Sequence, residues 1–175
     1  MAGSSATTVP WHGIREAPIV LVSGPESFLA DRAIRIMSDR LKSAEAGVEV
    51  SDIDAADYAG GELFQLASPS LFGEPRLVRV DRVEKCSDAF LDDALSYLAS
   101  PEPDVVVVLR HGGGNRGKKL LDALKKSGDT VLLVECKEIK KDADRMAFIS
   151  AEFQRMGATI APAALRALAV QLRAQ

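Results

Sequence analysis

A glycine turn near the N-terminus has the layout of a phosphate-binding loop. The apolar stretch 19–22 predicts a buried strand, Gly24 follows it, and an amphipathic helix begins a few residues later. A working P-loop needs a second glycine, so that its amides can cradle phosphate, and then a Lys and a Ser or Thr for Mg²⁺. Counted from Gly24, these positions hold Leu29, Ala30 and Asp31. The Asp31 carboxylate would repel a polyphosphate at the helix N-terminus. We therefore predict a degenerate nucleotide loop, containing Gly24, Glu26 and Leu29, that binds no ATP or other cofactor.

A second glycine-rich loop, 112–119, matches the spacing G-x-x-x-x-G-K between a predicted strand and a predicted helix. Lys119 stands where a Ser or Thr would bind Mg²⁺, and the loop follows the fourth predicted strand, whereas P-loop folds bind nucleotide after the first. Three interpretations remain open: an ATPase or kinase that uses Lys118, a DNA-binding module, or a flexible and solvated connection. The DNA interpretation involves contacts to the phosphate backbone from Arg116, Lys118 and Lys119.

The other residues that could carry chemistry form no catalytic or metal-binding pattern. Cys86 and Cys136 lack the spacing of a zinc site, and the chain has only two histidines. Asp81 ends a predicted strand, but Arg82 follows it in place of the second acid that a hydrolysing ATPase uses. We expect no metal and no catalysis by this chain.

The elements that must position these loops alternate along the chain. We predict strands at 19–22, 48–50, 76–81, 105–109 and 131–135, with helices near 29–41, 62–67, 88–98 and 118–126 between them. The stretch 105–109 is so apolar that both of its faces must be covered, as in a parallel sheet. The pattern indicates a doubly wound α/β domain with a parallel five-stranded sheet and a P-loop fold, in residues 1–140.

From residue 141 the pattern is helical only, and we interpret 141–175 as the beginning of a second domain in a truncated chain. Residues 1–10 are rich in Ser, Thr and Ala and are expected to be irregular. No apolar run approaches the roughly 20 residues that span a bilayer, so we expect a cytoplasmic protein without membrane contact. The net charge is −3, yet residues 110–145 carry ten Lys or Arg and six Asp or Glu. Such an excess is typical of solvated helix faces and is also compatible with contact to nucleic acid.

Two large apolar residues, Leu71 and Phe72, stand side by side between Pro69 and Gly73. Exposing them forfeits roughly 1.5 to 3 kcal/mol for each side chain, so chemistry alone favours their burial beneath the sheet. The alternative is a surface loop that keeps both side chains for the pocket of a partner.

The order of these features resembles the delta subunit of the bacterial DNA polymerase III clamp loader. The resemblance covers most of the chain and rests on 24–26 with Leu29, on 70–73 with 76–78 directly after it, and on the helical segment past 141. It implies an AAA+-like domain that binds no ATP, followed by the start of a helical lid domain.

The resemblance also implies a function in DNA replication, without enzymatic activity of the chain by itself within the polymerase III holoenzyme. Ser70, Leu71 and Phe72 would bind the hydrophobic pocket of the β sliding clamp and help to open this ring, which reverses the expectation of burial. Further partners would be the gamma/tau and delta-prime subunits, with DNA contact within the complex. Clamp-binding peptides often carry Gln four residues before the Leu, a position that is Ala67 here.

Overall fold

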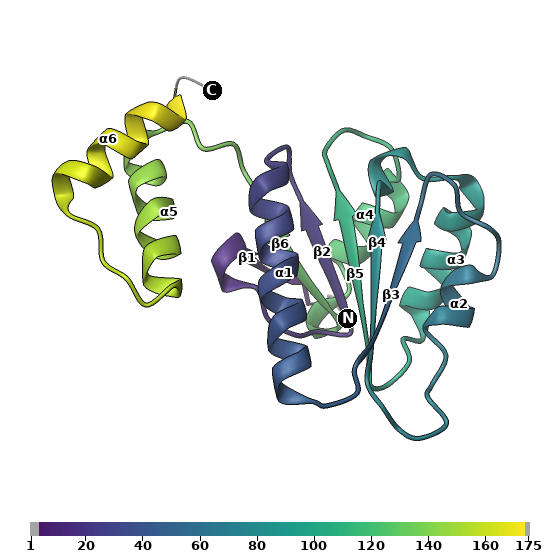
Figure 1. Cartoon of the computed structure of the whole chain (residues 1–175). Helices are drawn as coiled ribbons and strands as arrows, with labels where there is room; N and C mark the ends of the chain where they lie inside the picture. The colour runs from purple at the N-terminus through teal and green to yellow at the C-terminus, as the bar shows by residue number, and fades with distance from the viewer. Residues whose placement is uncertain (1–3, 174–175) are drawn as a thin grey trace. The chain divides into compact units, whose positions relative to one another are not determined.

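Six parallel strands form the sheet at the centre of the first part of the chain (Figure 1). The computed structural model describes residues 4–173. The strands are β1 (Thr7–Pro10), β2 (Ile19–Ser23), β3 (Glu49–Asp54), β4 (Arg76–Asp81), β5 (Val105–His111) and β6 (Val131–Glu135). Their order in the sheet is β1-β6-β2-β5-β4-β3, and every neighbouring pair is parallel. The predicted α/β class and the parallel sheet are confirmed.

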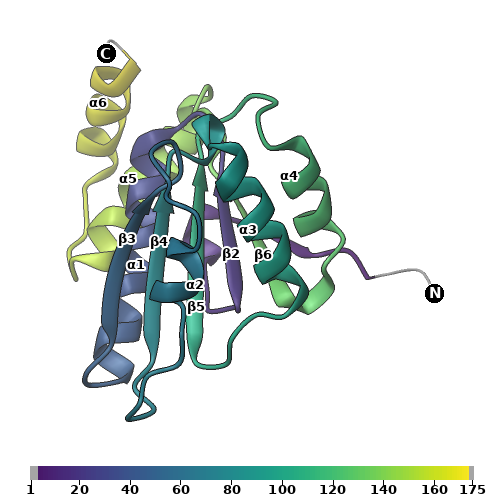
Figure 2. The same cartoon turned by 90° about the vertical axis from the view of Figure 1, so that its right-hand side faces the viewer.

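Helices cover both faces of the sheet, as the apolar central strands require. The helix α1 (Ser27–Ala44) connects β2 to β3 on one face. The connections from β3 to β6 run in the opposite direction along the sheet, and right-handed crossovers therefore place their helices on the other face. These helices are α2 (Glu62–Leu66), α3 (Asp88–Ala99) and α4 (Lys118–Lys125). Figure 2 shows α3 and α4 on the face opposite to α1.

The core consists of aliphatic side chains between these layers. The stripe Leu29, Ala33, Met37 and Leu41 of α1 is buried, as its helical spacing predicts. On the other face, Leu21, Val80 and Leu109 of the sheet belong to one buried cluster with Phe90 of α3 and Leu120 of α4.

The prediction of five strands was wrong, because β1 adds a sixth at one margin of the sheet. β1 pairs with β6 in the register Thr7↔Leu132 to Pro10↔Glu135. The exposed threonines of β1 give no apolar pattern from which a strand could be predicted. An edge strand such as β1 can form without one, because it is held largely by backbone hydrogen bonds. Pro10, which has no N–H to donate, is tolerated at such a margin. The expectation of an irregular N-terminus therefore fails for 7–10, and residues 1–3 lie outside the described part.

The chain divides into two compact units between Lys137 and Glu138, three residues before the expected boundary. The second unit contains α5 (Asp142–Arg155) and α6 (Pro162–Arg173), which pack against each other.

The parallel sheet separates the loops into two groups. Loops that follow a strand lie at the carboxyl end of the sheet, among them the turn at Gly24 and the loop 112–117. Loops that precede a strand lie at the amino end, among them 67–75, which connects α2 to β4 (Figure 1).

Candidate functional site

The turn at Gly24 is packed directly against the end of β6. Gly24 has φ +131°, and a Cβ at this residue would lie 2.2 Å from the carbonyl oxygen of Cys136. The Gly24 N–H donates to the carbonyl oxygen of His111 (3.1 Å), and the Glu26 N–H donates to that of Cys136 (3.3 Å). Two amides of this turn are therefore hydrogen-bonded within the protein.

Three buried side chains lie near this turn, those of Arg110, Leu29 and Cys136, whereas Glu26 in the turn itself is half-buried. Arg110, only 8% exposed, donates through Nη1 to the carbonyl oxygens of Gly24 (3.2 Å) and His111 (2.8 Å). Leu29 is buried in α1. Burial raises the pKa of the Cys136 thiol to about 11, so this residue is protonated at neutral pH and packs as an apolar side chain.

Backbone amides of the loop 112–117 are also hydrogen-bonded within the protein. The Gly112 N–H donates to the Glu84 carboxylate (2.9 Å), and the Gly113 N–H donates to Nδ1 of His111 (3.1 Å). Because Nδ1 accepts, the His111 proton is on Nε2, which donates to the carbonyl oxygen of Arg116 (2.9 Å). Burial alone would raise the pKa of Glu84, but the hydrogen bond from the Gly112 N–H and the positive charge of nearby Arg110 bring this pKa below its ordinary value. A carboxylate thus already accepts the first amide of this loop.

The three basic residues predicted to contact DNA differ in their surroundings. Arg116 donates through Nε to the carbonyl oxygen of Cys86 (2.9 Å) and through Nη2 to Asp88 (2.9 Å), which ties the loop to the start of α3. Lys118 pairs with Asp122 one turn further along α4 (2.8 Å) but remains 73% exposed, and Lys119 is exposed. Residues 113–116 are exposed, as a solvated connection would be, while the Arg116 side chain and the amides of Gly112 and Gly113 are hydrogen-bonded within the protein.

Leu71 and Phe72 are the most exposed large apolar side chains among the described residues, at 97% and 87%. The burial that chemistry alone favoured is therefore wrong. The chain reverses in a tight turn, in which the Gly73 N–H donates to the carbonyl oxygen of Ser70 (3.2 Å) and Gly73 has φ +71°. The hydroxyl of Ser70 accepts the Phe72 N–H (3.2 Å). We call residues 70–73 the Leu-Phe turn.

Arg76, at the first position of β4, makes contacts that hold the base of the Leu-Phe turn, at Ser68, in place. Its Nη1 donates to both the carbonyl oxygen and the hydroxyl of Ser68, the latter at 2.9 Å. Its Nε pairs with Glu49 of β3 (3.1 Å), and the Ser68 hydroxyl donates to the carbonyl oxygen of Gln65 (2.8 Å). These contacts connect the end of α2, the turn and two strands. Local spacing does not predict these contacts, because Glu49 and Ser68 are separated from Arg76 in the chain.

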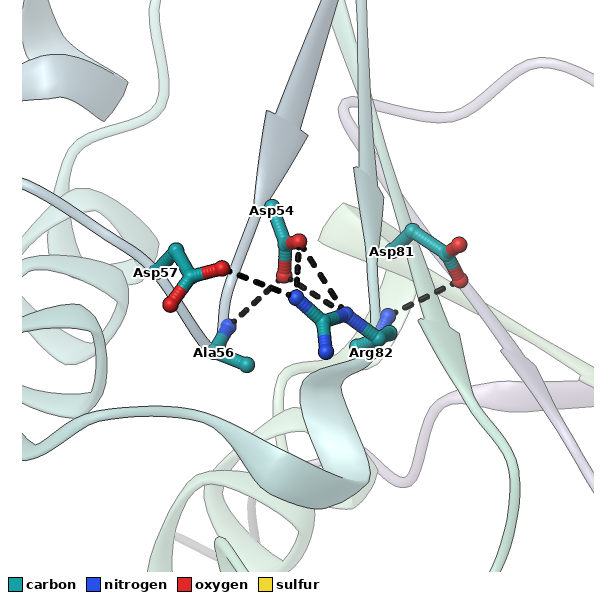
Figure 3. A network of polar contacts seen from close by, with 5 residues as sticks. All are labelled: Asp54, Ala56, Asp57, Asp81 and Arg82. Atoms are coloured by element: carbon teal, nitrogen blue, oxygen red, sulfur yellow. Dashed lines mark hydrogen bonds and ion pairs between the residues drawn. The ribbon is translucent and has the colours of Figure 1, made fainter.

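An ion-pair network that local spacing does not predict either lies at the carboxyl end of β3 and β4 (Figure 3). Arg82, at φ +54°, pairs with Asp54 and with Asp57 (3.1 Å), and its N–H donates to the Asp81 carboxylate (2.8 Å). Figure 3 shows the Asp81 carboxylate directed away from the guanidinium. Hydrogen bonding to Arg82 lowers the pKa of Asp54. The arrangement joins the ends of two strands through Arg82.

The structure thus brings the predicted nucleotide loop and the 112–119 loop together at the carboxyl end, and it places the Leu-Phe turn at the opposite end of the sheet. In the described residues 4–173, no helix is long and apolar enough to cross a bilayer. Within the same range, no group of three or more His, Cys, Asp or Glu is arranged to hold a metal ion.

Comparison with known proteins gives a match at the level of structure. No protein-family model matches the chain. No curated protein matches it in sequence. Among solved structures, the chain is similar to the Bacillus subtilis DNA clamp loader delta protein (YqeN), with a TM-score of 0.62 and 22% identity. The match covers 86% of this chain and 47% of that protein, so the chain spans about half the length of its structural relative. The resemblance expected from the sequence is confirmed for the fold, which is similar to that of a clamp loader delta protein.

Proposed function

We propose that this chain is a delta-type subunit of a replication clamp loader, which binds the β sliding clamp through the Leu-Phe turn. The observation that carries the proposal is the near-complete exposure of Leu71 and Phe72 on a braced turn. In this assignment, residues 1–140 are an AAA+-like domain and 141–175 are the beginning of a helical lid. Its partners are the clamp and the other loader subunits, gamma/tau and delta-prime.

The energetics of exposure support a protein partner for the turn. Transfer of one such side chain from water to an apolar pocket is worth roughly 1.5 to 3 kcal/mol. The hydrogen bonds of Ser70 and the brace from Arg76 order the turn before binding, which lowers the entropy lost on association. Two adjacent apolar anchors on a preorganised turn are typical of an interface hot spot.

The hydrogen bonding of both glycine loops supports a subunit that does not hydrolyse ATP. Gly24 packs on Cys136, and the Gly24 and Glu26 amides are engaged within the protein. In the second loop, the amides of Gly112 and Gly113 are engaged as well, and Glu84 adds a negative charge. These contacts weaken the alternative of a P-loop ATPase or kinase.

The chain would act on the ring by binding alone. A ligand shifts an equilibrium between closed and open forms only through its different affinity for the two. We propose that the rigid first unit holds Leu71 and Phe72 so that docking favours the opened clamp. The free energy of ATP would enter through other subunits of the loader.

Any contact with DNA would involve the exposed part of the basic segment. Arg116 is engaged with Cys86 and Asp88, so Lys118 and Lys119 are the better candidates for phosphate contacts within an assembled loader. If the chain were instead a separate DNA-binding module, it would bind DNA without the clamp, and its affinity for DNA would fall as the salt concentration rises.

A calorimetric titration with the β clamp of the same organism tests the proposal. The double variant Leu71→Ala with Phe72→Ala should lose roughly 2 to 4 kcal/mol of binding free energy, which abolishes detectable binding. Its melting temperature should be unchanged, because both side chains are exposed. Phe28→Ala is the matched control, since Phe28 is 56% exposed at the opposite end of the sheet and should bind like the wild type. Unchanged affinity in the double variant would reject the proposal.

A further inference from the structure

Carboxylates surround the base of the Leu-Phe turn. Three segments, 45–49, 67–76 and 100–104, lie at the amino end of the sheet before β3, β4 and β5. They carry five acidic residues and a single cation, Arg76. The acidic residues are Glu45, Glu49, Glu74, Glu102 and Asp104, and we call them the amino-end carboxylates. All except Glu102, which is half-buried, are exposed.

Backbone contacts join the three segments next to the turn. The Arg76 N–H donates to the carbonyl oxygen of Asp104 (2.9 Å), and the Glu49 N–H donates to that of Pro75 (3.2 Å). A Cβ on Gly47 would lie 3.6 Å from the Glu74 carboxylate, so the 45–48 loop faces this side chain. Glu74 itself is two residues from Phe72. The amino-end carboxylates therefore share one end of the sheet with the two apolar anchors.

The single cation does not neutralise this charge. The Arg76 guanidinium is engaged with Glu49 and Ser68. No ion pair within residues 4–173 engages Glu74, Glu102 or Asp104. The three segments next to Leu71 and Phe72 thus carry a net negative charge, and Lys42 in the last turn of α1 is the cation that directly precedes the first of them in the chain.

We infer that the apolar pocket that receives Leu71 and Phe72 is bordered by Lys and Arg side chains that face the amino-end carboxylates. The inference rests on the proposed function and specifies the chemistry of the surface on the clamp. Docking brings the border of the pocket close to these carboxylates. A cationic border accelerates encounter and orients the turn, whereas an acidic border would repel it. The apolar anchors then provide affinity, and the charges provide the rate of association and its dependence on salt.

Association rates with the β clamp of the same organism, measured over a series of NaCl concentrations, test this inference. The test variant is Glu74→Gln with Asp104→Asn, and Asn suits the positive φ of 58° at residue 104. The control is Asp31→Asn with Asp92→Asn, which changes the net charge equally through exposed residues in the N-terminal halves of α1 and α3, toward the carboxyl end of the sheet.

The association rate of the wild type should fall as salt increases. At low salt, the test variant should associate about threefold to tenfold more slowly, in the range expected for two exposed charge pairs. The two rates should converge at high salt, where such charges are screened. The control variant should associate like the wild type.

The inference is overturned if the test variant associates as fast as the control or faster. If Leu71→Ala with Phe72→Ala abolishes binding while the test variant remains indistinguishable from the wild type, the clamp assignment stands and only the cationic border is rejected. If the wild type does not bind the clamp at all, the proposed function and this inference fail together.

Discussion

Gly24 lies against the backbone of Cys136, so closely that a Cβ at residue 24 would come within 2.2 Å of the Cys136 carbonyl oxygen. The Cys136 N–H in turn donates to the carbonyl oxygen of Ser23 (2.7 Å), and this oxygen of Cys136 accepts the Glu26 N–H. The turn at Gly24 thus makes a packing contact between the end of β2 and the residue that follows β6. Gly24 therefore has a structural function, because only a residue without a Cβ allows this close packing.

Gly24→Ala should destabilise the protein by about 2 to 4 kcal/mol, because a steric clash adds to the strain of a positive φ. Unfolding in urea measures this cost. Gly113→Ala isolates the strain, since residue 113 has φ +115° with nothing within 4 Å of its Cβ, and it should cost about 1 to 2 kcal/mol. Gly60→Ala has neither problem and should be close to neutral. Equal costs at residues 24 and 113 would contradict the packing function.

ATP with Mg²⁺ should leave the melting temperature unchanged. A ligand at a hundredfold its dissociation constant would stabilise the folded protein by about 2.7 kcal/mol, which a thermal shift assay detects readily. A rise that depends on Mg²⁺ would revive the enzyme interpretation. Repeating the assay with Lys118→Ala would then show whether the 112–119 loop or the turn at Gly24 binds the nucleotide.

Ser70→Ala should weaken clamp binding without affecting the fold. The variant removes the acceptor of the Phe72 N–H, so the turn must be ordered on binding, at a cost of about 0.5 to 1.5 kcal/mol or roughly threefold to tenfold in affinity. Its stability should stay within about 0.5 kcal/mol of the wild type, because the turn is on the surface. Ser70→Asn keeps a side-chain acceptor and should retain most of the affinity. A loss as large in Ser70→Asn as in Ser70→Ala would show that the hydrogen bond does not order the turn.

The Asp54–Arg82 pair should contribute stability that disappears in acid. Because the hydrogen bond from Arg82 holds the pKa of Asp54 below its ordinary 3.8 in the folded protein, the contribution is present above 3.8 and is lost as the pH falls through the lower, folded value. The gap in unfolding free energy between the wild type and Asp54→Asn should be constant from neutral pH to about pH 5 and then narrow. Arg82→Gln should lose the same pH dependence, since the cation lowers this pKa. If this difference in unfolding free energy widens as the pH falls, the Asp54–Arg82 pair is not the source of the pH dependence.

Much of the fold was predictable from local pattern. The apolar runs at β2 and β5 and the alternation with helices predicted a parallel α/β sheet, because a strand buried on both faces must be apolar throughout. β1 was not predictable in this way. A polar segment at the margin gains its structure from the backbone of β6, which is more than 120 residues away.

The candidate sites show the same division. The sequence by itself determined that the turn at Gly24 lacks the residues of a working P-loop, because that chemistry depends on residue types at fixed spacing. It could not determine whether Leu71 and Phe72 are buried, since burial depends on whether distant segments leave room for them. Only the tertiary structure decided that both side chains are exposed, with Arg76 bracing the turn. The same holds for Arg116, which meets Cys86 and Asp88, while Lys118 and Lys119 remain exposed. Contacts between segments far apart in the chain form only when the sheet assembles, so the local spacing of residues does not predict them.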